Sequence, residues 1–167
     1  MNETDSFRQR FSIGWRAIKT AVAVFITIAT YAIFNLGEGT LASLSAVFSL
    51  RENMSDTYLY AKYRIFGNTV GVLIAIFLFF IRQQLLLGNN DLYNSISGGL
   101  GVLLVINCCT FFGNQQSIIN SVATFLVVFL STPEDSLMIY GVSRIMDTIY
   151  GTIVAIIINH ILPNRKH

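Results

Sequence analysis

A run of 42 residues without a charged side chain, from Leu92 through Pro133, is the feature that most limits how this chain can fold. A helix rises about 1.5 Å per residue, so the run measures roughly twice the hydrocarbon thickness of a bilayer. The polar turn Gly113-Asn114-Gln115-Gln116 lies near its middle. The run therefore predicts two membrane helices joined by a tight turn.

The remaining apolar stretches extend this prediction to the whole chain. Only 12% of the residues are charged and 53% are hydrophobic, whereas about a quarter of an ordinary soluble domain is charged. Four more helices are predicted over residues 16–36, 39–50, 65–81 and 137–162. The second of these is expected to be short or broken, because 12 residues cannot make an upright crossing. We therefore predict an all-α integral membrane protein, with residues 1–167 forming a single membrane domain of six transmembrane helices.

Basic residues indicate how the bundle sits in the membrane. They gather at the two ends of the chain, as Arg8, Arg10, Arg16, Lys19, Arg165 and Lys166. Cytoplasmic segments are enriched in lysine and arginine, so both termini are expected in the cytoplasm, as an even number of helices allows. Arg82 and Arg144 run against this bias.

Two segments that lie 80 residues apart share a pattern. Residues 64–71 (RIFGNTVG) and 144–151 (RIMDTIYG) agree at Arg, Ile and the final Gly, and Ala75-Ile76 matches Ala155-Ile156. The offset is close to three helices, so the pattern predicts two repeats, over about residues 13–82 and 93–163. Three helices are an odd number, and the second repeat must then begin on the opposite side of the membrane, which makes the repeats inverted.

The repeat pairs the short second helix with the fifth helix, so the fifth is expected to be short or broken as well. Short or interrupted helices at matching positions of two repeats point to a transport pathway. The alternative is that the second helix is simply tilted and packed.

Polar and charged side chains at membrane depth are few, and they mark candidate sites. The candidates for an anion pathway are Arg64, Arg144, Lys19, Asn68, Thr69, Asp147 and Thr148. Two guanidiniums that approach from opposite sides of the membrane suit a carboxylate better than lysine does, and anchoring at the membrane surface is their alternative role. Asp147 is the only acidic residue inside a predicted span. It is expected to neutralise Arg144, with uptake and release of a proton as the alternative.

Small residues recur every four positions on two of the predicted helices. Gly67, Gly71 and Ala75 lie on one and Gly151 and Ala155 on the other, where they are expected to bring helices close together. The sequence has no nucleotide-binding, zinc-protease or serine-hydrolase motif. Cys108 and Cys109 are adjacent and lack the spacing of a metal site, and the net charge is only +2. We therefore expect neither an enzyme nor a metal site, a cofactor or a nucleic-acid partner.

The same segments resemble a known family. Residues 64–71 are similar to the R-x-x-G-T-x-x-G motif, and residues 144–151 to the R-x-x-D-T-x-x-G motif, of the bacterial aromatic acid exporter and fusaric acid resistance superfamily. The start, Ile13-Gly14-Trp15-Arg16-Ala-Ile-Lys19-Thr20-Ala21, resembles the opening helix of that family. Two departures are Asn68, where the family has threonine, and the lack of the cytoplasmic domain that follows the membrane part in many members.

The resemblance implies a multi-pass protein of the bacterial plasma membrane that exports aromatic or other organic carboxylates. It also implies a distant relation to the plant aluminium-activated malate channels, which are dimeric anion channels. We expect a transporter or channel that exports organic carboxylate anions, working as a homo-oligomer, preferably a dimer, or with a partner membrane subunit. The alternatives are a non-transporting membrane scaffold or small subunit, and a flippase for lipids or polymer precursors.

Overall fold

The computed structural model describes residues 14–84, 91–133 and 136–162, and all regular structure in these ranges is helical. The elements are α2 (Trp15–Phe34), α3 (Thr40–Ser49), α4 (Met54–Gln84), α5 (Asp91–Phe111), the 3₁₀ turn η1 (Gln115–Ser117), α6 (Ile118–Ser131) and α7 (Leu137–Ile161). The prediction of an all-α fold is confirmed for these residues. Some predictions fall outside the described residues. They concern the first residue of the first repeat (13), the last residue of the second repeat (163), the outermost basic residues of both termini, and Glu134 and Asp135.

Four of the described helices are long and apolar enough to cross a membrane, namely α2, α4, α5 and α7. Helix α3 has 10 residues and α6 has 14, and even with η1 the segment Gln115–Ser131 stays below the length of a full span. The second and fifth helices are therefore short, as the sequence predicts. By length and composition, four helices of the described chain rather than six qualify as full crossings.

The connection between α2 and α3 shows why α3 begins where it does. Helix α2 ends at Asn35, which adopts the left-handed conformation with φ of 52° and donates its backbone N–H to the Tyr31 carbonyl. Gly39 then precedes α3 with φ of 64°, and a Cβ at this position would lie 3.0 Å from the Tyr31 side chain. Glycine therefore permits both the backbone conformation and the close contact with α2.

Helix α4 is longer than predicted, because it begins at Met54 rather than near Ile65 and has 31 residues. The prediction used charges as boundaries, but Asp56 and Lys62 lie within the first turns of the helix without ending it. Lys62 is exposed, and Asp56 accepts a hydrogen bond of 3.2 Å from the Asn53 amide. A helix that continues past the apolar core of a membrane can carry such residues at its solvated end.

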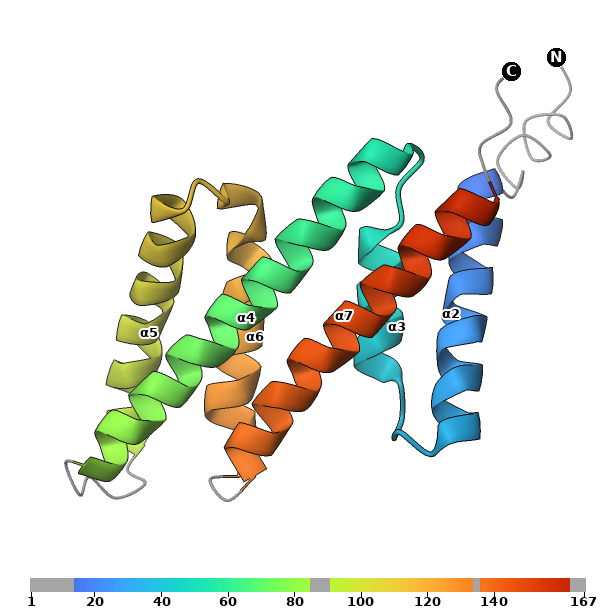
Figure 1. The fold of residues 1–167 in the computed structure, drawn as a ribbon. Coiled ribbons are helices and arrows are strands. Elements are labelled where there is room, and N and C mark those ends of the chain that lie inside the picture. Colours follow the sequence, from blue (N-terminus) through green and yellow to red (C-terminus); the bar gives the residue numbers. More distant parts are fainter. Residues whose placement is uncertain (1–13, 85–90, 134–135, 163–167) are drawn as a thin grey trace, which may run out of the picture.

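The helices form a row in which α4 and α7 lie side by side and antiparallel at the centre (Figure 1). Helices α5 and α6 pack on the α4 side of this row, and α2 and α3 pack on the α7 side. One hydrophobic cluster joins α4 to α5, α6 and the start of α7, around Val72, Phe125 and Val128. A second cluster joins α2, α3 and the end of α7, around Ala46, Leu50 and Ala155.

The two central helices approach the short helices through glycine. A Cβ at Gly71 would lie 2.5 Å from the Ser121 carbonyl oxygen and 3.1 Å from the Thr124 Cβ. A Cβ at Gly151 would lie 2.0 Å from the Ala42 carbonyl oxygen and 2.9 Å from the Ser45 Cβ. Helix α4 therefore meets α6 at backbone distance, and α7 meets α3 in the same way.

Candidate functional site

A cavity of about 430 Å³ lies where α3, α4, η1, α6 and α7 meet. Its size falls in the range of small-molecule sites. The lining residues are Leu44, Phe48, Arg51, Tyr60, Tyr63, Arg64, Gln116, Ser117, Ile119, Asn120, Ala123, Thr124 and Arg144. Three of them are arginines and none is acidic, so the lining has a net positive charge.

The three arginines have few partners within the protein. Arg64 donates a hydrogen bond of 3.4 Å to the Ser45 hydroxyl on α3, and Arg144 donates one of 3.4 Å to the Tyr140 hydroxyl on its own helix. The Nε atoms of Arg51, Arg64 and Arg144 are buried and make no hydrogen bond, and no carboxylate of the described chain pairs with any of the three side chains. Partly buried cations with so few partners favour an anion between them.

Aromatic side chains form part of the same lining. The Arg51 guanidinium lies over the Tyr60 ring, 3.8 Å from its centroid, and the Arg64 guanidinium lies over the Phe48 ring at 4.7 Å. Tyr63 also lines the cavity and packs edge-on against Tyr60, with ring centroids 6.3 Å apart. The cavity therefore combines cations with flat apolar surface, a combination that suits a ring bearing an acidic group.

A buried network of amides and hydroxyls supports the cavity wall. Asn68 on α4 accepts hydrogen bonds at Oδ1 from the Asn120 amide at 2.7 Å and from the Thr124 hydroxyl at 2.6 Å. Its own amide donates to the Thr148 hydroxyl on α7. Asn120 and Thr124 line the cavity, so Asn68 fixes two lining side chains and links α4 to both α6 and α7.

The structure brings only some of the predicted pathway residues to the cavity. Arg64 and Arg144 line it, and Asn68 and Thr148 lie in the supporting network. Thr69 does not line it and donates a hydrogen bond of 2.8 Å to the Ile65 carbonyl of its own helix. Lys19 is fully buried elsewhere, where its Nζ donates to the Asn159 side chain at 3.0 Å.

Asp147 also lies away from the cavity, and the prediction that it pairs with Arg144 is wrong. The Tyr31 hydroxyl on α2 donates a hydrogen bond to the Asp147 carboxylate, and Tyr31 packs edge-on against Tyr150. Arg144 instead contacts Tyr140 and the cavity. Asp147 and Arg144 are three positions apart on α7, yet Asp147 is directed toward α2 and Arg144 toward α3 and α6. Their spacing in the sequence was therefore not sufficient to predict an ion pair.

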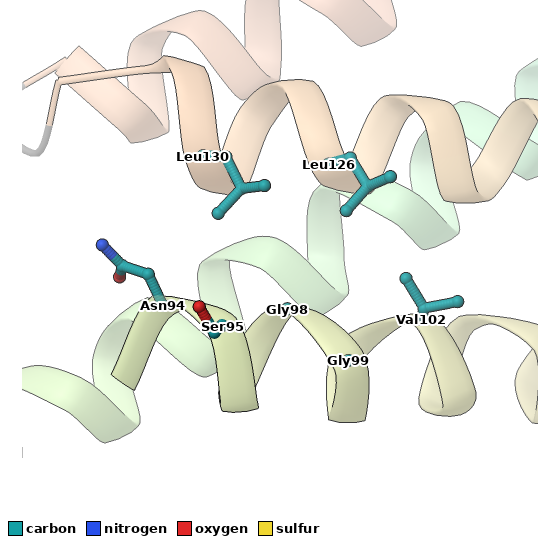
Figure 2. A pocket seen from close by; sticks show the side chains of 7 residues that line it. All are labelled: Asn94, Ser95, Gly98, Gly99, Val102, Leu126 and Leu130. Atoms are coloured by element: carbon teal, nitrogen blue, oxygen red, sulfur yellow. The ribbon is translucent and has the colours of Figure 1, made fainter. Parts of the chain in front are cut away.

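A second pocket of similar volume lies between α5 and α6 (Figure 2). Gly98 and Gly99 leave room on α5, and Leu126 and Leu130 face them from α6. Its lining has polar groups only at Asn94 and Ser95 and no charged side chain. This pocket therefore lacks a group that would hold an organic anion.

Sequence reasoning missed Arg51 and the aromatic lining. Arg51 lies in the connection between α3 and α4, outside every predicted helix, and Tyr60 and Tyr63 precede the predicted start of the third helix. The spacing of Tyr60, Tyr63 and Arg64 at one end of a helix was the available signal. It becomes informative only once α4 is known to begin at Met54.

Comparison with known proteins identifies the family of the chain. The model of a family described as "Aromatic acid exporter family member 1" matches residues 11–162. The chain belongs to the aromatic acid exporter family. The match covers nearly all of the chain, and it confirms the family that the two motifs and the opening helix resemble. Comparisons with curated proteins and with solved structures gave no match.

Membership of this family indicates a membrane transport protein. The family is one of exporters and not of enzymes. The apolar helices fit the same conclusion, because α2, α4, α5 and α7 have the length and composition of membrane spans. The protein is therefore a membrane-embedded member of an exporter family.

Proposed function

We propose that this protein exports organic carboxylate anions, including aromatic ones, across the bacterial plasma membrane, and that the cavity between α3, α4, α6 and α7 is their binding site. One observation carries the proposal: three arginines that have no acidic partner among the described residues surround a cavity with aromatic walls. A carboxylate supplies the missing acceptors, and a ring packs on Phe48, Tyr60 and Tyr63.

The packing of the helices supports an inverted repeat around this cavity. Gly71 meets residues 121 and 124, and Gly151 meets residues 42 and 45, so each contact is reproduced at an offset of about 80 residues. Asn68 and Thr148 are 80 residues apart and contact one another. Equivalent residues touch in this way when they lie beside a two-fold axis. Arg64 and Arg144 each lie one turn away from that pair, on antiparallel helices that border one cavity.

Flux into liposomes tests the proposal. Purified protein in liposomes is expected to carry radiolabelled benzoate faster than protein-free liposomes. Arg64→Gln and Arg144→Gln are each expected to lower the initial rate at least about tenfold, because each removes a partly buried charge that meets the carboxylate. Lys62→Gln is the matched control, since Lys62 is an exposed cation on α4 outside the cavity. If wild-type protein carries no organic anion, or if all three variants behave alike, the proposal is wrong.

An anionic lipid headgroup is the second candidate for the cavity. Helices α3 and α6 border the cavity but do not contact each other within the described residues. Leu44, Phe48 and Ile119 line it and are also exposed at the surface, as lipid-facing residues are. A fluorescent phospholipid in the same liposomes distinguishes the two candidates. Protein-dependent transfer of lipid between leaflets, without benzoate flux, favours the flippase.

A further inference from the structure

We infer that the cavity recognises dianions, specifically a single aromatic ring with two acidic groups, and that Arg51 binds the second acidic group. The inference rests on the proposed function, because it specifies the substrate class of the same cavity. It starts from Arg51, which lies outside the repeated motifs and supplies the third cation of the lining.

The position of Arg51 is fixed by its backbone and by its ring contact. Its backbone N–H donates a hydrogen bond of 3.0 Å to the Thr57 hydroxyl, which is fully buried at the start of α4. Thr57 in turn accepts a hydrogen bond of 2.8 Å from the Asn159 amide on α7. The guanidinium stacks on Tyr60, and its Nε is buried without a partner. Stacking uses the face of the guanidinium and leaves its N–H edge available to a carboxylate.

The charge of the lining determines how many acidic groups the preferred ligand carries. Buried or partly buried cations are costly when they lack a counter-charge. When a monocarboxylate occupies this cavity, two of the three arginines still lack a counter-charge. When a dicarboxylate occupies it, only one arginine lacks a counter-charge. The second carboxylate therefore adds a favourable interaction that a monoanion cannot make, and the aromatic walls favour a ring between the two groups.

Arg51 also lies where the cavity meets a second hollow at the protein surface. That outer hollow, lined by Arg16, Glu52 and Asp56, shares the residues Arg51, Tyr60 and Gln116 with the inner cavity. Its charges are mixed, whereas those of the inner cavity are all positive. An anion arriving from the outer hollow therefore meets Arg51 before it reaches Arg64 and Arg144.

Binding of two matched ligands to the purified full chain tests the inference. Benzoate and isophthalate share one ring and differ by one carboxylate. Calorimetric titration at pH 7.5 is expected to show that wild-type protein binds isophthalate at least about tenfold more tightly than benzoate. Arg51→Gln is expected to weaken isophthalate binding by about 10-fold to 100-fold and benzoate binding by less than about threefold. Arg51→Lys should recover part of the preference, and Lys62→Gln should leave both affinities unchanged.

The outcomes separate this inference from the proposed function. Equal affinity of wild-type protein for both ligands overturns the dianion inference without any variant, even if Arg51→Gln fails to fold. If folded Arg51→Gln loses the same factor of affinity for both ligands, the inference is also overturned, because Arg51 then contributes equally to the binding of monoanions and dianions. In both cases benzoate flux into liposomes still supports the proposed function. If neither ligand binds or is carried, the proposed function itself is wrong.

Discussion

Asn68 is the residue with the most consequential contacts in the described core. One oxygen accepts from Asn120 and Thr124 on α6, and one amide donates to Thr148 on α7. Asn68 stands where the family resemblance leads one to expect threonine, whose shorter side chain has one hydroxyl in place of an amide. The longer amide lets a single α4 residue bond to two neighbouring helices at once.

Replacing Asn68 by leucine, which has a similar volume, should destabilise the protein by about 2–3 kcal/mol. The Asn120 amide would keep only its 3.3 Å bond to the Arg64 carbonyl, and the buried Thr124 hydroxyl would lose the acceptor that it uses here. Asn107→Leu is the matched control, because Asn107 is exposed on α5 and bonds only to its own helix. Denaturant titration in detergent micelles measures both variants. Similar unfolding free energies for the two would show that the network contributes little.

At the scale of the element, the sequence predicts the existence and order of the helices better than their lengths. Apolar runs identified all six described helices, because charges are costly in lipid and only short polar turns separate the runs. The run of α7 contains Arg144 and Asp147, whereas the other runs have no charge in their central part. They misplaced the start of α4 by 11 residues, from 65 to 54, because a helix does not end where the apolar core ends. The short length of α3 was predictable from the positions of Gly39 and Arg51 at its two ends.

The candidate site was predictable only in the part that is repeated. Arg64 and Arg144 were found because they occupy equivalent positions of two similar segments. Arg51, Phe48 and Tyr60 come from a connection and two helix ends, and their meeting depends on how α3 and α4 pack. The sequence pattern also did not predict the partner of Asp147 correctly, because Asp147 contacts Tyr31 on α2 rather than Arg144 on its own helix.

Gly151→Ala should weaken the contact between α7 and α3 and lower the free energy of unfolding by about 1–3 kcal/mol. The added Cβ meets a backbone carbonyl oxygen, that of Ala42, so the helices themselves must move apart. Gly99→Ala on α5 is the matched control, because a Cβ there has no neighbour within 4 Å. Thermal unfolding followed by circular dichroism compares the two. Equal stability of the variants would contradict the close approach of α3 and α7.

At the scale of the whole molecule, charge is distributed unevenly between the two ends of the row of helices. The start of α2, the α3–α4 and α5–η1 connections and the end of α7 lie at one end (Figure 1). This end carries the basic residues Arg16, Arg51 and Lys62 beside the acidic Glu52 and Asp56, whereas the opposite end carries Glu38 in the α2–α3 connection and Arg82 in the last turn of α4. From the positive-inside rule we expect the outer hollow next to Arg51 to lie on the cytoplasmic side, where an exporter would collect its substrate.

Labelling of single added cysteines in cells tests this orientation. Glu38 and Gln115 are both exposed, and they lie at opposite ends of the row. A membrane-impermeant maleimide should label Glu38→Cys in cells with an intact plasma membrane, and should label Gln115→Cys only after that membrane is permeabilised. The unsubstituted chain gives the background from Cys108 and Cys109, which lie within α5. The reverse labelling pattern would place the outer hollow outside the cell, where Arg51 would meet an imported anion first, and would contradict export by this route.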